Sequence, residues 1–214
     1  MLQFITNTES HVSPAEQVKA VISGGCRWVQ IRMKDASDEE VKKVVEEIKP
    51  LCLETETFLI LNDRVELAKE LNVGGVHLGK DDMLPSKARL VLGPAAVIGI
   101  TANTIEDIIA VRSLDIDYIG IGPYRETSTK KNLAPILGLE GIRKINSEME
   151  QKEINIGHVA VGGINLDDVI PLMEAGCNGI AVSGAIAKAP DIEKATREFL
   201  DVLKPFLKAE GINC

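Results

Sequence analysis

The sequence has few aromatic residues and no excess of basic ones. It contains four Phe, two Tyr and one Trp in 214 residues, and its 24 Lys and Arg against 32 Asp and Glu give a formal net charge of −8. Nucleic-acid binding needs a basic surface for phosphates and often aromatic side chains on which bases stack. The composition therefore argues against a nucleic-acid partner.

Long apolar runs and targeting features are also missing. No run approaches the roughly 20 apolar residues of a membrane helix, and the first 13 residues have neither the basic start nor the apolar stretch of a signal peptide. We therefore expect a cytoplasmic protein with no membrane partner.

Cysteines are few and widely spaced. Cys26, Cys52, Cys177 and Cys214 form no CxxC or other metal-ligand pattern, so we interpret them as reduced thiols. His77 lies within an apolar run and is interpreted as a core histidine with its hydrogen bonds satisfied. The histidines show no ligand spacing either, and the sequence gives no indication of a zinc site.

Short apolar, β-branched runs recur along the chain with helical segments between them. They are apolar on both faces, as parallel strands covered by helices are. The eight runs are Phe4–Asn7, Trp28–Met33, Phe58–Asp63, Gly75–Gly79, Ala96–Thr101, Tyr118–Gly122, His158–Gly163 and Gly179–Gly184.

The intervening segments carry helical spacing and helix-start signals. Apolar residues at i, i+3 and i+4 predict helices over Asp38–Leu53, Thr104–Leu114, Leu139–Met149 and Ile192–Leu207. Ser13 and Ser37 each precede a Glu by three residues, which predicts capping boxes, and Thr104 and Asp191 are further candidate caps.

Eight such units in 214 residues leave about 27 residues each, which suits one (β/α)₈ TIM barrel over residues 1–214. A doubly wound open sheet is the alternative fold, and it requires some of the eight runs to be misassigned. The longest irregular stretch, Pro123 to Gly138, follows the sixth strand, where a barrel builds its active site, and is interpreted as a mobile lid or binding loop.

Three polar side chains alternate at the end of the second run. Gln30, Arg32 and Lys34 share one strand face because the side-chain period is two. If that face is the barrel interior, two cations and an amide lie at its mouth and need an anionic partner. The other interpretation is the solvated face of an edge strand.

Carboxylates follow the third and fourth runs. Asn62-Asp63-Arg64 ends one run, and Lys80-Asp81-Asp82 closely follows the next. A turn or a helix cap accounts for Asn-Asp alone. Carboxylates from two adjacent loops, however, are what Mg²⁺ takes when it bridges to substrate phosphates.

Anion-binding features recur later in the chain. Thr127, Ser128 and Thr129 precede Lys130 and Lys131 after the sixth strand, either as phosphate donors or as ordinary solvated loop. Gly162-Gly163 and Ser183-Gly184 end the seventh and eighth runs, where many barrels bind phosphate, although steric needs at barrel corners also favour glycine. Two separate anion sites indicate two phosphorylated substrates or one bisphosphate.

Taken in order, these motifs resemble the thiamin phosphate synthase family over essentially the whole chain. The resemblance rests on Gln30-Ile31-Arg32-Met33-Lys34, Asn62-Asp63-Arg64, Val76-His77-Leu78-Gly79 with Asp82, Asp117-Tyr118-Ile119-Gly120-Ile121-Gly122-Pro123, Thr127-Ser128-Thr129-Lys130, and Gly162-Gly163-Ile164.

The resemblance implies an enzyme that joins 4-amino-5-hydroxymethyl-2-methylpyrimidine diphosphate to 4-methyl-5-(2-hydroxyethyl)thiazole phosphate and releases diphosphate. It also implies a role for each matching position. The pyrimidine diphosphate would be bound by Gln30, Arg32, Lys34, Asn62, Thr101 and Lys130. The thiazole phosphate would be bound by Thr127, Ser128, Thr129, Gly163, Ser183 and Gly184.

Asp63 and Asp82 would hold Mg²⁺, which with Arg32, Lys34 and Lys130 would stabilise the departing diphosphate. A pyrimidine-methyl cation would form first and be captured by the thiazole nitrogen, with no protein nucleophile.

The sequence departs from the family pattern at three positions. Thr101 stands where Ser is usual, Lys80 where Gln is usual, and Gly184 where Ser or Ala is common. A related thiazole tautomerase is one alternative function, against which the metal and diphosphate residues argue. A non-catalytic barrel that senses a phosphate ester is another. The oligomeric state, a homo-oligomer included, is left open.

Overall fold

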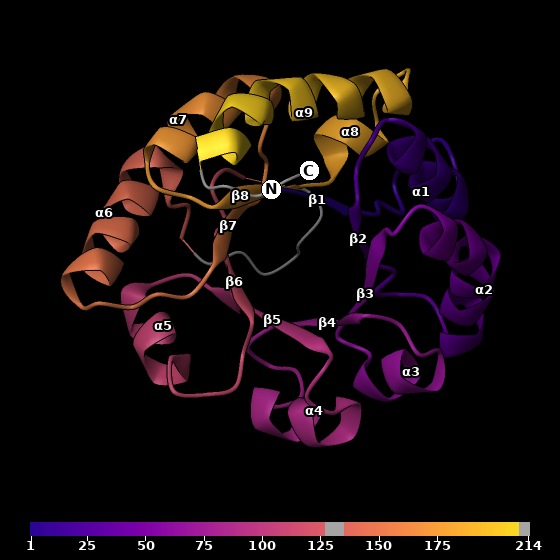
Figure 1. Cartoon of the computed structure of the whole chain (residues 1–214), viewed down its shortest axis with the longest axis horizontal. Coiled ribbons are helices and arrows are strands. Elements are labelled where there is room, and N and C mark those ends of the chain that lie inside the picture. Colours follow the sequence, from indigo (N-terminus) through magenta and orange to yellow (C-terminus); the bar gives the residue numbers. More distant parts are fainter. Residues whose placement is uncertain (127–134, 210–214) are drawn as a thin grey trace.

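Eight parallel strands close into a barrel in the computed structural model, which describes residues 1–126 and 135–209, with side chains to residue 206. Each strand pairs with its sequence neighbours, and β1 pairs with β8 to close the ring (Figure 1). Closure excludes the open-sheet alternative. The strands are β1 (Leu2–Ile5), β2 (Trp28–Ile31), β3 (Phe58–Asn62), β4 (Gly75–Leu78), β5 (Val97–Ala102), β6 (Tyr118–Ile121), β7 (His158–Val161) and β8 (Gly179–Val182).

Helices form a ring outside the strands (Figure 1). They are α1 (Pro14–Ser23), α2 (Asp38–Glu54), α3 (Val65–Glu70), α4 (Pro85–Leu92), α5 (Ile105–Val111), α6 (Gly138–Gln151), the 3₁₀ turn η1 (Leu166–Asp168), α7 (Val169–Glu174), α8 (Gly184–Ala187) and α9 (Ile192–Ala209). Capping boxes at Ser13, Ser37 and Thr104 are confirmed, and Asp191 accepts from the Lys194 amide at 2.9 Å. These caps satisfy backbone donors at the helix starts and so set where each helix begins.

Two apolar layers hold the barrel together. The larger one fills the space between the strands and the helices, with residues such as Phe4, Val29 and Leu172 fully buried. A smaller cluster lies inside the barrel, where Ile5, Ile60, Tyr118, Val159 and Ala181 meet partly buried aromatic and valine side chains. The inner cluster closes the barrel below its mouth, so the polar strand ends are left to form a site above it.

The first strand starts and ends two residues earlier than predicted. Phe4–Asn7 is wrong as a boundary because Leu2 already pairs with Ile180 of β8. At Asn7 the backbone leaves the sheet: its amide donates to Gln17 Oε1 at 2.9 Å, and its carbonyl accepts from Gln17 Nε2 at 2.8 Å. A buried glutamine on α1 therefore replaces the sheet partner, which strand periodicity does not reveal.

Three cysteines lie in the core. Cys26, Cys52 and Cys177 are buried free thiols, and burial raises the pKa of each to about 11. Cys214 and the loop residues Thr127 to Lys131 lie outside the described part of the chain. Among the described helices, none is long and apolar enough to cross a membrane.

Candidate active site

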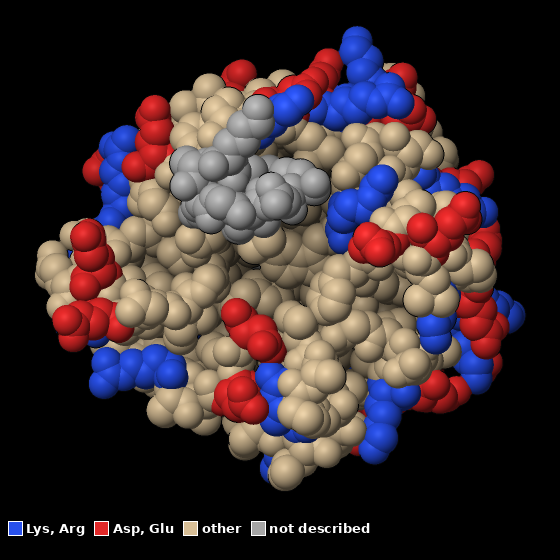
Figure 2. All heavy atoms as spheres, viewed as in Figure 1, with Lys and Arg blue, Asp and Glu red and all other residues tan. Residues whose placement is uncertain are grey.

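A cavity of about 560 Å³ opens at the carboxyl ends of the strands. Figure 2 shows this face hollowed at its centre, with charged side chains of both signs around the outer helices. The cavity is lined by Gln30, Arg32, Lys34, Asn62, Asp63, Asp82, Thr101, Gly163, Ser183 and Gly184. The structure thus brings together every predicted site residue in the described ranges. Thr127, Ser128, Thr129 and Lys130 fall outside them, so their predicted roles rest on sequence alone.

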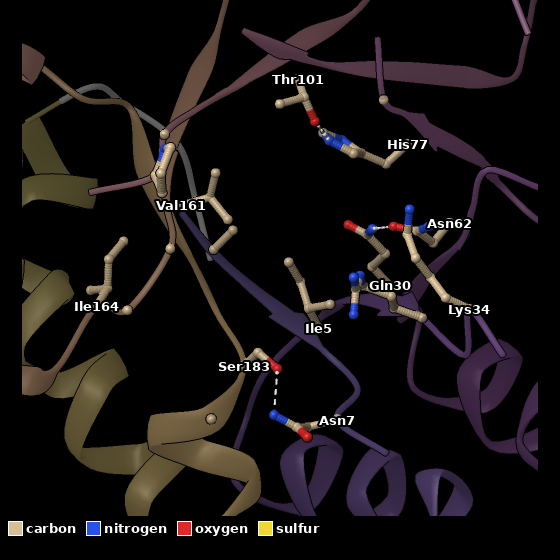
Figure 3. A pocket seen from close by; sticks show the side chains of 18 of the residues that line it. Ile5, Asn7, Gln30, Lys34, Asn62, His77, Thr101, Val161, Ile164 and Ser183 are labelled. Atoms are coloured by element: carbon tan, nitrogen blue, oxygen red, sulfur yellow. Dashed lines mark hydrogen bonds between the residues drawn. The ribbon is translucent and has the colours of Figure 1, made fainter. Parts of the chain in front are cut away.

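The alternation along β2 aims its polar side chains into the barrel. Gln30 is 1% exposed and donates through Nε2 to Asn62 Oδ1 at 2.8 Å (Figure 3). Its Oε1 is buried with no hydrogen-bond partner within the described structure. A buried acceptor without a partner is costly, so this amide is suited to receive a hydrogen bond from a ligand.

Two cations continue the β2 face towards the rim. Burial lowers the pKa of Arg32, while the charges of Asp63 and Asp35 oppose that effect. Lys34 Nζ lies 3.2 Å from Asp63 Oδ2, and the lysine side chain is nearly half exposed. Positive charge that is partly withdrawn from water interacts strongly with an anion, because solvent screens it less.

Asp63 and Asp82 meet at the mouth of the barrel from two neighbouring loops. Asp63 follows β3 with φ 66°, a left-handed conformation that aspartate tolerates. Asp82 is held by the turn after β4, where its Oδ2 accepts from the Gly79 amide at 2.6 Å. Each of the two carboxyl groups affects the ionisation of the other.

Asp63 and Asp82 differ in their affinity for a proton. Burial, and then the neighbouring Asp82, raises the pKa of Asp63 to about 6 despite the nearby Lys34 ammonium. Burial also disfavours ionised Asp82, but hydrogen bonds from Asp63 and the Gly79 amide outweigh it and lower the Asp82 pKa. Asp63 therefore binds a proton more readily than Asp82. A cation placed beside both groups would relieve the repulsion between the two carboxylates.

The donor set fits a hard divalent cation better than zinc. Within the described residues, no group of three or more His, Cys, Asp and Glu side chains is placed to hold a metal. Two carboxylates at an open mouth suit Mg²⁺, which keeps several waters and shares its remaining positions with substrate phosphates. The predicted magnesium site thus has suitable oxygen ligands in Asp63 and Asp82.

His77 is a satisfied interior histidine, as predicted. Its Nδ1 lies 2.8 Å from the Tyr118 hydroxyl, and its Nε2 lies 3.0 Å from Thr101 Oγ1 (Figure 3). The imidazole also lines the cavity. It therefore connects the inner cluster to the hydroxyl of Thr101 at the cavity wall.

The opposite wall is built from β7, β8 and β1. Gly163 has φ 66°, and a Cβ there would lie 2.8 Å from the Glu126 carbonyl, so both backbone shape and space require glycine. Ser183 Oγ accepts from Asn7 Nδ2 at 3.3 Å across the end of β8 (Figure 3). This wall presents backbone and hydroxyl groups, and its cations Arg125 and Lys188 are each paired with a carboxylate of the protein.

Sequence reasoning missed several cavity residues. Asn7, Asn103, Arg125 and Lys188 all line the cavity. Asn7 and Asn103 closely follow the ends of β1 and β5, a position that could have indicated them, whereas Arg125 lies farther beyond β6 and Lys188 ends α8. Lys188 Nζ lies 2.7 Å from Glu9 Oε2.

Arg125 is held in place by Asp168 from η1. Two of its guanidinium nitrogens donate to the Asp168 carboxylate at 2.8 Å, and one also donates to the Gly163 carbonyl. Tyr124 adds a hydrogen bond to Asp168 at 3.1 Å. The cluster ties the chain after β6 to the turn after β7, and it engages the Arg125 charge within the protein.

The chain matches known proteins over most of its length. The family model described as "Thiamine monophosphate synthase" matches residues 2–186. "Thiamine-phosphate synthase" of Bacteroides fragilis is 51% identical over 201 residues, covering 94% of this chain and 98% of that protein. The protein of that name from Bacteroides thetaiotaomicron is 49% identical, covering 94% and 96%.

A solved structure agrees with the sequence matches. "Thiamine phosphate pyrophosphorylase from Pyrococcus furiosus" superposes with a TM-score of 0.85 at 30% identity and covers 96% of both chains.

Proposed function

The chain belongs to the thiamine monophosphate synthase family of transferases, and from that premise we propose that it joins two phosphorylated substrates into thiamin phosphate. The substrates are 4-amino-5-hydroxymethyl-2-methylpyrimidine diphosphate and 4-methyl-5-(2-hydroxyethyl)thiazole phosphate. The observation that carries this proposal is one cavity with cations and a carboxylate pair on one wall and a glycine and serine wall opposite. That division suits two different anions.

The cationic wall is the site for the pyrimidine diphosphate. Arg32 and Lys34 follow the end of β2, and Gln30 and Asn62 present fixed amide groups beside them. These groups would hold the diphosphate and lower the energy of the charge that grows on it as it leaves. Lys130 adds a further cation by the family resemblance.

The residues at the mouth also fit Mg²⁺. Asp63 and Asp82 would hold it, and when bound it would supply Lewis-acid stabilisation to the diphosphate oxygens. Lys34, which contacts Asp63, would then be positioned to contact the diphosphate as well. A bound cation would also favour the ionised form of Asp63.

The bond changes require no nucleophile from the protein. The bond between the pyrimidine methylene carbon and the diphosphate oxygen breaks, and the oxygen keeps the electron pair. The thiazole nitrogen then gives its lone pair to the methylene carbon. The wall formed by Gly163, Ser183 and Gly184, together with Thr127, Ser128 and Thr129, would hold the thiazole phosphate so that this nitrogen faces the carbon.

The test is product formation from both substrates with Mg²⁺, followed by fluorescence after oxidation of thiamin phosphate. Lys34→Met should lower kcat/KM by about 100-fold, because a charge aligned with the leaving group is lost. Lys42→Met is the matched control, since Lys42 pairs with Glu70 on the outer helices and should leave activity unchanged. A wild-type protein that binds the thiazole phosphate but makes no product would instead support a sensor.

A further inference from the structure

Four polar side chains form a hydrogen-bonded line across the barrel interior and up to the cavity. Gln3 Nε2 donates to the Tyr118 hydroxyl at 2.9 Å, and that hydroxyl lies 2.8 Å from His77 Nδ1. His77 Nε2 lies 3.0 Å from Thr101 Oγ1. The residues come from β1, β6, β4 and β5, so the sequence does not reveal that they hydrogen-bond in a line.

Glycine makes room for this line. A Cβ at Gly99 would lie 2.1 Å from two atoms of the Tyr118 ring, and one at Gly120 would lie 3.1 Å from the His77 ring. The Tyr118 ring also packs edge-on against Trp28, with centroids 4.8 Å apart. Packing on both sides therefore fixes where the Tyr118 hydroxyl points.

The donor and acceptor groups determine which atom donates in each hydrogen bond of the line. An amide nitrogen only donates, so the Tyr118 oxygen accepts from Gln3 and its own proton goes to His77 Nδ1. Burial raises the pKa of Tyr118, so its proton stays in place. With Nδ1 as an acceptor, the neutral imidazole carries its proton on Nε2 and donates to Thr101 Oγ1.

Thr101 then accepts one hydrogen bond and still has its own proton to donate. Among the described residues, its hydroxyl makes no other hydrogen bond, and Thr101 lines the cavity. The β-branched threonine has fewer side-chain rotamers than serine, which restricts the hydroxyl further. The free proton is therefore aimed at whatever occupies the cavity.

We propose that Tyr118 is a positioning residue that holds His77 as its Nε2–H tautomer and thereby makes the Thr101 hydroxyl a hydrogen-bond donor to the pyrimidine diphosphate. The proposal rests on the proposed function for the identity of the ligand. The ligand group must be an acceptor, either a ring nitrogen or a phosphate oxygen. Tyr118 itself does not line the cavity and acts only through His77.

The tautomer is tested without any substrate. Nitrogen-15 NMR of the labelled protein at about pH 8, where histidine is ordinarily neutral, distinguishes Nε2–H from Nδ1–H. The chain has three histidines, so His77→Gln assigns the signal directly. Wild type should show Nε2–H at His77, and Tyr118→Phe should show a mixture of both forms.

The consequence for binding is tested by a double-mutant cycle. Thr101→Val should raise the KM for the pyrimidine diphosphate by about tenfold, and Tyr118→Phe by about twofold to threefold, since its mixture keeps part of the Nε2–H form; neither should change the KM for the thiazole phosphate. The double variant should be no worse than Thr101→Val alone, because both changes remove the same hydrogen bond. Trp28→Phe is the control, since it alters the packing on the Tyr118 ring but keeps the four hydrogen-bonding groups.

The outcomes separate this proposal from the proposed function. Nδ1–H in wild type would mean that the Gln3 amide oxygen accepts from Tyr118, and it overturns the proposal, as do additive KM effects in the double variant. A tautomer unchanged by Tyr118→Phe also overturns it. A wild-type protein that forms no thiamin phosphate while His77 is Nε2–H refutes the proposed function and supports the hydrogen-bond direction.

Discussion

Replacing Asp63 by Asn should stabilise the metal-free protein, although it removes a residue of the active site. The pKa of Asp63 is about 6 against an ordinary 3.8, and each pH unit is worth about 1.36 kcal/mol, so ionised Asp63 costs the folded state about 3 kcal/mol. A raised carboxyl pKa costs nothing below about pH 4 and its full amount above about pH 6. Asparagine removes this cost but deprives Lys34 of its partner, so we expect a net gain of about 1 to 2 kcal/mol at pH 7.

Asp82→Asn should act in the opposite direction. The pKa of Asp82 is lowered, because hydrogen bonds from Asp63 and the Gly79 amide outweigh burial. Its carboxylate therefore stabilises the fold above its ordinary pKa, and this contribution is lost as the pH falls through the lowered value. At pH 7 we therefore expect Asp82→Asn to lower stability.

Thermal unfolding in EDTA measures whether each of the two substitutions raises or lowers stability. For a chain of this length, about 1 kcal/mol corresponds to about 2 to 4 °C, so Asp63→Asn should unfold several degrees above wild type. With Mg²⁺ and diphosphate added, wild type should gain stability by mass action and neither variant should match it. Asp201→Asn, at an exposed position on α9, is the control and should keep the full gain.

Two results would refute this reasoning separately. Destabilisation by Asp63→Asn in EDTA would show that ionised Asp63 does not destabilise the folded protein. An undiminished response to Mg²⁺ and diphosphate in Asp63→Asn would show that this carboxylate does not hold the metal.

Three further predictions follow from the packing and the buried charges. Gly99→Ala should destabilise the fold by more than about 2 kcal/mol in urea unfolding, because a methyl group there meets the Tyr118 ring, and wild-type stability would show that the ring can move aside. Asp168→Asn should cost about 1 to 3 kcal/mol at pH 7 by loss of the Arg125 pair. Burial raises the pKa of Asp168, but hydrogen bonds from Arg125 and its neighbours outweigh burial and lower the pKa. The stability deficit of Asp168→Asn should therefore vanish only as the pH falls below about 4. A deficit unchanged at low pH would contradict this origin. The three buried thiols should resist a thiol reagent in the native protein and react in urea, whereas rapid native reaction would contradict their burial.

The barrel could be predicted because its signals are local. Each strand is an apolar run of four to six residues, and each capping box is complete within four residues. The alternation of Gln30, Arg32 and Lys34 likewise sufficed to predict a polar face at the barrel mouth, where all three line the cavity. The predicted strand Trp28–Met33 is too long, however, because β2 ends at Ile31 and the two cations follow it. The strand ends were less predictable, since Asn7 leaves the sheet only because Gln17 binds its backbone.

The parts of the site that depend on contacts between distant residues could not be predicted. The sequence places Asp63 and Asp82 on adjacent loops, but only their contact in the fold gives them opposite pKa changes. In the sequence Arg125 is one cation of a loop, and only the fold shows that it donates two hydrogen bonds to Asp168. Lys188 follows the last strand but belongs to no motif, and only the cavity reveals its position.

Phosphorus-31 NMR of a reaction mixture tests the central claim most directly. With Mg²⁺ and both substrates, the proposed function predicts one diphosphate released for each thiamin phosphate formed, at equal rates, and none of either product from a single substrate. Binding of both substrates with no new phosphorus signal would contradict it.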